Sequence, residues 1–364
     1  MTAFKKYFKY EMRRMLLPLI VITVICTLIA AVPAMLTDFE ARTLLSGGTR
    51  APLIWIPQLL LGILCLAVPM LMFSFKMSQK QVDSMYSMPI SRTNLYFVKA
   101  LVGLILVLVP YTVAYWLAFM ATALSANSFA LVWFLPLFFA SIPIAIALFG
   151  FVAFVFTRAN RKFDGLAWVV CYCGALALVV AWIVFLVARS TPTLSLSDSW
   201  LWVILSFIAY VPLILTSNHF QHMIHDAPDM WTLRNGTMMQ QYPIWWLSFA
   251  LWGVIGAAAW FGLLWSAKKQ KAENAGRVSD SWFGYRTLIP YSLVFSIAML
   301  VDLRGPLAFI FIVQSVVSGA IAYFIFRRSV HLKTEDLIIG GSAIFLGVVL
   351  SLINFATYPI FGTF

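Results

Sequence analysis

The chain has 364 residues, of which 62% are hydrophobic and only 10% are charged, and its mean hydropathy is +0.93. A water-soluble domain cannot bury that much apolar surface, so the composition excludes a soluble protein and predicts a chain surrounded by lipid. The net charge of +12 does not indicate a nucleic-acid partner. The cations lie in gaps between apolar runs, so they report membrane orientation and contact with anionic lipid.

Ten apolar runs follow one another along the chain, and none contains Asp, Glu, His, Lys or Arg. Backbone groups in lipid must bond within their own segment, so we expect helices, most of them long enough for the roughly 20 residues of a crossing. The runs are Leu16–Leu36, Ala51–Phe75, Ala100–Ala121, Phe129–Phe156, Gly165–Ala188, Trp200–Thr216, Ile244–Ser266, Thr287–Val301, Pro306–Phe326 and Leu337–Tyr358.

Residues 1–15 are basic and aromatic, and they lead into the first run without a convincing cleavage site, so we expect a retained first span. Phe4, Phe8, Met12 and Met15 recur at helical spacing, while lysines and arginines fill the other faces. The pattern predicts an amphipathic helix in the cytoplasmic membrane interface. Such a helix is either an anchor or a connecting helix that also touches a cytoplasmic partner.

Residues 76–99 form a cytoplasmic loop between the second and third apolar runs. Pro89 ends any helix before it, and Ser91 can cap a new helix that continues into the third span. A small apolar set precedes this break: Val82, Met85, Tyr86 and Met88. A short helix with an exposed apolar tip predicts a docking element, and the alternative is a plain turn between two helices.

The sixth run, Trp200–Thr216, decides the expected topology. If it does not cross and the N-terminus is inside, 20 of the 25 lysines and arginines face the cytoplasm, whereas a crossing lowers that number to 14. We therefore expect a re-entrant or surface-lying helix within an external segment at residues 189–243. Nine crossings and an external C-terminus follow.

The external segment also holds His219, His222 and His225, with Asp226 and Asp229 close behind. Steps of three residues drift around a helix, so a compact metal site there is strained. An interfacial helix with amphipathic histidines is the preferred interpretation.

Glycines in the seventh run predict close helix packing. Gly253, Gly256 and Gly262 lie among alanines, and small residues let helix backbones approach one another. The approach is either within this chain or across a dimer seam.

The sequence Met88–Arg92, followed by Leu95 and Lys99, resembles the loop after the second span in the membrane (permease) subunits of ABC-2 type ABC transporters, bacterial exporters in particular. The order of segments over about residues 1–266 is similar as well. The resemblance implies an all-α polytopic membrane protein with a connecting helix at residues 1–15 and a coupling helix between spans two and three.

The same resemblance implies a six-span core at residues 16–266, with a re-entrant external helix between spans five and six. A cytoplasmic linker at residues 267–286 and about three additional spans at residues 287–364 extend that core. The linker is either a charged connection or a second contact for a cytoplasmic partner.

In this family the coupling helix inserts into a cleft of a separate ATP-binding subunit. Carried over to this chain, the resemblance implies the following contact residues: Asp83, Ser84, Met85, Tyr86, Met88, Pro89 and Arg92. It also implies two ATP-binding subunits that hold ATP and magnesium, and a second permease subunit, identical or paralogous. The chain has no G-x-x-x-x-G-K-[ST] sequence, so we expect no ATPase site, catalytic residue or cofactor in it.

The expected function is export of a hydrophobic or amphipathic substrate (a peptide, lipid or drug) across the bacterial cytoplasmic membrane, with the N-terminus in the cytoplasm. An ion-coupled secondary transporter is the first alternative, and the absence of Asp, Glu and His from every apolar run disfavours it. An intramembrane enzyme is the second alternative, and it would have to use the His219–Asp229 cluster.

Overall fold

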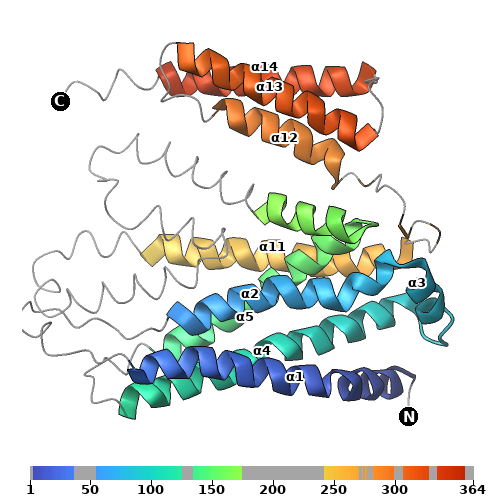
Figure 1. The fold of residues 1–364 in the computed structure, drawn as a ribbon, viewed down its shortest axis with the longest axis vertical. Helices are drawn as coiled ribbons and strands as arrows, with labels where there is room; N and C mark the ends of the chain where they lie inside the picture. Colours follow the sequence, from blue (N-terminus) through green and yellow to red (C-terminus); the bar gives the residue numbers. More distant parts are fainter. Residues whose placement is uncertain are drawn as a thin grey trace, which may run out of the picture. The chain divides into compact units, whose positions relative to one another are not determined.

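The computed structural model describes residues 3–36, 55–124, 134–173, 242–269, 273, 275–276, 281, 283–298, 306–327 and 334–356. In these residues all regular structure is helical and no strand occurs, which confirms the expected all-α class (Figure 1). The chain divides into two units. Unit 1 comprises Met1–Leu166 and Trp202–Val278, and unit 2 comprises Ala167–Leu201 and Ser279–Phe364.

Unit 1 contains the helices that surround the predicted coupling loop. They are α1 (Ala3–Leu36), α2 (Trp55–Phe73), η2 (Ser74–Met77), α3 (Gln79–Tyr86), α4 (Arg92–Leu124), α5 (Phe134–Arg158) and α11 (Tyr242–Lys269). Helix α1 packs along α4, α2 packs against both α4 and α5, and α11 packs mainly against α5.

Five helices in the described part of the chain are long and apolar enough to cross a membrane. They are Phe4–Met35, Ile56–Met77, Arg92–Ala121, Phe138–Arg158 and Thr334–Ser351. Two of their hydroxyl groups are satisfied within their own helix: those of Thr23 and Thr112 donate to the carbonyl oxygens four residues earlier, each at 2.7 Å. The expected nine crossings remain a prediction, since much of the chain between these helices lies outside the described residues.

Helix α1 is one continuous helix of 34 residues. The sequence predicts a boundary near residue 15, whereas the structure continues the first turns directly into the apolar part. In that apolar part Cys26, Ala30 and Ala34 are buried, while larger residues such as Leu17 and Leu28 are exposed. Small residues at steps of four thus place α1 against α4, and its other faces are left for lipid.

The contact between α5 and α11 is close because of two of the predicted glycines. A Cβ atom on Gly256 would lie 2.5 Å from the Cβ atom of Ala147, and one on Gly262 would lie 2.7 Å from the ring of Phe154. Gly253 has nothing within 4 Å. Close packing within one chain is therefore confirmed for Gly256 and Gly262.

Unit 2 contains α12 (Tyr285–Ala298), α13 (Pro306–Arg327) and α14 (Thr334–Ala356). A hydrophobic core joins them: Ile289, Leu293, Tyr323, Phe326 and Ala343 are all buried.

The fifth apolar run belongs to unit 2 from Ala167 onward. Residues 162–173 are helical, and the ring of Trp168 packs edge-on against Tyr285 with centroids 5.7 Å apart. The hydroxyls of Tyr172 and Thr287 lie 2.9 Å apart. The expected six-span core at residues 16–266 contains this run but not α12. The structure instead groups the run from Ala167 with α12 in unit 2, so the expected division of the chain differs from the observed one.

Candidate functional site

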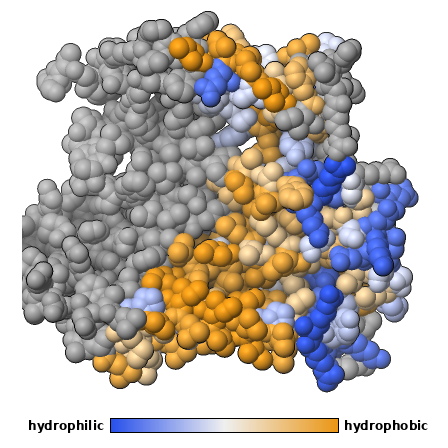
Figure 2. Space-filling view, viewed as in Figure 1, coloured by the Kyte–Doolittle hydropathy of each residue, from blue (hydrophilic) through white to orange (hydrophobic). Residues whose placement is uncertain are grey.

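The candidate site lies at one end of unit 1. There α3 and the turn at residues 87–91 connect α2 to α4, beside the first turns of α1 (Figure 1). Hydrophilic residues gather at this end, next to a hydrophobic surface that covers the long helices (Figure 2). This separation is typical of a membrane protein whose polar end emerges from the hydrocarbon core.

The turn between α3 and α4 has the local structure that the sequence predicts. Pro89 lies in the turn, and the backbone N–H of Ile90 donates to the carbonyl oxygen of Met88 at 2.7 Å. Ser91 caps the start of α4: its Oγ accepts from the N–H of Asn94 at 3.4 Å, and its carbonyl oxygen accepts from the N–H of Leu95 at 3.0 Å. The predicted break and cap are therefore confirmed.

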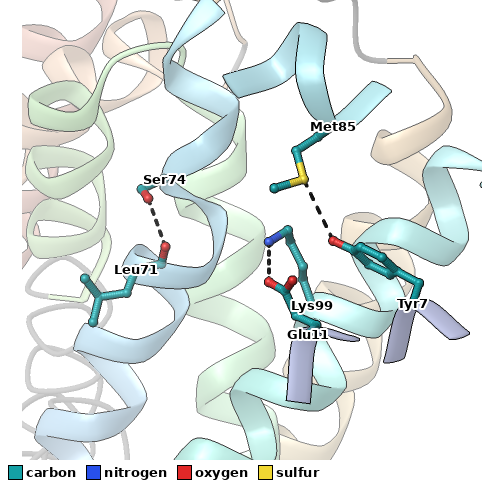
Figure 3. Close-up of polar contacts among 6 residues, drawn as sticks. All are labelled: Tyr7, Glu11, Leu71, Ser74, Met85 and Lys99. Atoms are coloured by element: carbon teal, nitrogen blue, oxygen red, sulfur yellow. Dashed lines mark hydrogen bonds and ion pairs between the residues drawn. The ribbon is translucent and has the colours of Figure 1, made fainter. Parts of the chain in front are cut away.

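Helix α3 directs its apolar side chains inward. Val82 is only 1% exposed, and Met85 and Tyr86 are half-buried. The hydroxyl of Tyr7 in α1 donates to Met85 Sδ at 3.9 Å (Figure 3), and the hydroxyl of Tyr86 lies 3.5 Å from that of Tyr96 in α4. The expectation of an exposed apolar tip is thus wrong for α3, because α1 and α4 supply side chains that cover it.

The exposed residues of this segment are polar or carry charge, apart from the proline. Asp83, Ser84, Pro89 and Arg92 are exposed, while Met88 is half-buried. The Arg92 guanidinium lies 4.7 Å from the centroid of the Tyr86 ring. This cation–π contact joins the end of α3 to the start of α4 across the turn. All seven implied contact residues therefore lie in one short segment, but only four of them are exposed.

Lys76 in η2, directly after α2, binds the end of α5. Its ammonium group is buried and donates to the carbonyl oxygens of Thr157 and Ala159, the latter at 3.2 Å. Carbonyl groups at a helix C-terminus lack intrahelical partners and carry partial negative charge, so a lysine placed there satisfies them.

Glu11 and Lys99 form a buried ion pair between α1 and α4 (Figure 3). Lys99 Nζ lies 2.7 Å from Glu11 Oε1, and the two side chains are 4% and 0% exposed. The ammonium group also lies 4.8 Å from the centroid of the Phe75 ring. Both charges are therefore compensated at close range, as burial requires.

This pair is not among the site residues that the sequence predicts. One signal was available: Glu11 is the first acid of the chain and lies among five cations, with the next acid at Asp38. It is also four residues after Tyr7, so both share one face of the helix, and both are buried. The predicted apolar face at Phe4, Phe8 and Met12 is only half-buried.

The loop after α11 is hydrogen-bonded to the residues that follow α5. The N–H of Gly276 donates to the carbonyl oxygen of Asn160 at 2.9 Å, and Arg161 Nε donates to the carbonyl oxygen of Gly276 at 2.8 Å. Gly276 has a φ of 79°, which favours glycine. The predicted linker thus returns to this end of unit 1.

Of the predicted external segment at residues 189–243, residues 189–241, with His219, His222, His225, Asp226 and Asp229, lie outside the described residues, and the last two residues begin α11. Among the residues that the structure describes, no group of three His, Cys, Asp or Glu side chains could hold a metal ion.

The long apolar helices define the class of this protein: it is a helical integral membrane protein with several candidate spans. Comparison with known protein families, with curated proteins and with solved structures finds no significant match for the chain.

Proposed function

We propose that this chain is the membrane subunit of an ATP-driven transporter of the ABC-2 type, and that α3 with the following turn docks on a separate ATP-binding subunit. One observation carries the proposal: α3 is held from the inside by side chains of two long helices, while Asp83, Ser84, Pro89 and Arg92 remain exposed on the outside. A docking element needs both properties.

The inward contacts supply a route for mechanical coupling. A displacement of α3 acts on α1 through Met85 and Tyr7, and on α4 through Tyr86 and Tyr96. The buried Glu11–Lys99 pair joins α1 to α4 at the same level of the bundle. These three helices would then move together when a partner pushes on α3.

The energy source is proposed to be a partner because this chain offers none. Its sequence has no phosphate-binding loop, and its apolar runs hold no acid or histidine for ion coupling. Glu11 is a buried acid, but it precedes the first run and is paired with Lys99 at 2.7 Å. A proton-coupled carrier would instead place its acid near the middle of the bilayer.

The proposed assembly has two such permease subunits, identical or paralogous, and two ATP-binding subunits that hold ATP and magnesium. It would lie in a bacterial cytoplasmic membrane with α3 and the N-terminus in the cytoplasm. Export of a hydrophobic or amphipathic substrate fits best, because the apolar runs hold no charged residue that could act as a counter-ion to a charged cargo.

The test is isolation of the full chain from its native membranes in a mild detergent, with the bound polypeptides identified by mass spectrometry. We expect a polypeptide with a phosphate-binding loop in equal amount to this chain. Asp83→Lys reverses an exposed charge on α3 and should lower the recovery of that polypeptide at least about tenfold.

Glu335→Lys is the matched control, because Glu335 is also an exposed acid on a helix but lies at the start of α14. It should leave recovery unchanged. Equal recovery with both variants would contradict the docking role of α3. Transport of a solute by the chain alone, driven by an ion gradient in liposomes, would contradict the ATP-driven function.

A further inference from the structure

A second buried polar cluster joins three spans of unit 1. Gln58 of α2, Tyr111 of α4 and Ser141 of α5 are each 0% exposed. The Tyr111 hydroxyl donates to Gln58 Oε1 at 3.2 Å and lies 2.7 Å from Ser141 Oγ. The cluster is neutral, because the apolar runs that contain these residues hold no charged side chain.

Half of the Gln58 amide has no partner. Gln58 Nε2 is buried without any hydrogen bond. Exchanging the positions of Gln58 Oε1 and Nε2 still leaves one of these atoms without a hydrogen bond. Nε2 would then donate to Tyr111, and Oε1 would be the unpaired atom. An unpaired buried amide is unfavourable, so this cluster is incomplete in either orientation.

The cluster lies deep in the span and is lined with aromatic rings. Tyr111 follows Lys99 by about 18 Å along α4, at 1.5 Å per residue. The ring of Phe138 stacks on Tyr111 with centroids 5.8 Å apart, and Trp116 lies 5.5 Å from Phe138. A ligand here would meet aromatic rings beside a few polar atoms, a combination that is typical of small-molecule sites.

A proline accompanies each member of the cluster. Pro57 precedes Gln58, Pro110 precedes Tyr111, and Pro143 follows Ser141 by two residues. Pro110 and Pro143 lie inside their helices and have no N–H to donate to the preceding turn. Helices bend most readily where that bond is missing, so α4 and α5 can bend at the level of the cluster.

We propose that Gln58, Tyr111 and Ser141 form a binding site for the amide group of an apolar molecule, such as a peptide bond or an N-acyl chain. An amide carries an acceptor and a donor, so it complements the unpaired half of Gln58 in either orientation. A charged group is excluded because no counter-ion is present in these runs. The assignment of this molecule as transported cargo rests on the function proposed above.

The test uses the full chain in lipid nanodiscs and three photoactivatable probes of equal length: N-methyldecanamide, methyl decanoate and an alkane, each with a diazirine at the same carbon. Mass spectrometry of the cross-linked peptides measures labelling of α2, α4 and α5. We expect the amide to label the segments around the cluster about fivefold more than the alkane, the ratio that a hydrogen bond of about 1 kcal/mol gives.

Gln58→Leu should abolish that ratio, whereas Gln314→Leu should preserve it, because Gln314 is an exposed glutamine of α13. Thermal unfolding confirms that both variants are folded. Equal labelling by amide and alkane, an unchanged ratio in Gln58→Leu, or an ester as strong as the amide would overturn the proposal. A fivefold ratio in a chain that recruits no ATP-binding subunit would support the amide site and overturn only the ATP-driven function.

Discussion

Helix α4 carries two buried polar clusters of different chemistry. Near its start Lys99 pairs with Glu11, whereas about 18 Å further along Tyr111 joins two neutral side chains. Desolvation of a charge is costly, and the cost rises with depth in the bilayer. The chain therefore confines these buried charges to the polar end of unit 1 and uses neutral hydrogen bonds deeper in the spans.

The largest expected effect comes from breaking the ionic cluster. Glu11→Leu leaves the Lys99 ammonium buried and unpaired, so we expect the free energy of unfolding to fall by about 3–5 kcal/mol. The double variant Glu11→Leu/Lys99→Met removes both charges and should recover most of that loss. Thermal or denaturant unfolding in detergent measures both values.

Lys269→Met serves as the control for Glu11→Leu, because Lys269 is an exposed cation at the end of α11. We expect this variant to change the free energy of unfolding by less than about 0.5 kcal/mol. If the single variant at Glu11 were as stable as this control, the ion pair would not hold α1 to α4.

A smaller effect is expected from Lys76→Met, which removes the cation from the C-terminal carbonyl groups of α5. Those buried acceptors lose a charged donor, so we expect a loss of about 1–3 kcal/mol in the free energy of unfolding. Lys80→Met, on the exposed face of α3, should change it by less than about 0.5 kcal/mol. Equal changes in the two variants would show that Lys76 does not fasten α5.

The smallest effect is expected in the neutral cluster. Tyr111→Phe removes the hydroxyl that links Gln58 to Ser141 and should cost about 1 kcal/mol of the free energy of unfolding. Tyr10→Phe is the control, since Tyr10 is 55% exposed, and it should be neutral. A loss at Tyr111 as large as that at Glu11 would contradict the distinction between the two clusters.

Much of the local structure was predictable from the sequence. Apolar runs without charge predicted the long helices, and the spacing of Pro89 and Ser91 predicted the break and the new helix start that the structure confirms. These features depend on neighbouring residues alone, so a pattern along the chain is sufficient to find them. The ATPase contact and the external segment stay predictions.

The tertiary contacts were not predictable in the same way. Lys99 and Glu11 are 88 residues apart in sequence, and Glu11 among five cations resembles a solvated charge until α4 is placed beside it. The inward direction of Met85 and Tyr86 has the same origin. In a helix of only eight residues, the buried face is decided by what packs against it, here Tyr7 and Tyr96.

The unbroken course of α1 has a geometric consequence. A helix of 34 residues is about 51 Å long, well beyond the roughly 30 Å of a hydrocarbon core. The ion pair at Glu11 leaves about 37 Å of rod beyond it, up to Leu36. A tilt of about 10° around that pivot displaces the far end of α1 by about 6 Å. A small rotation at one side of the bilayer therefore becomes a larger displacement of the helix at the other side.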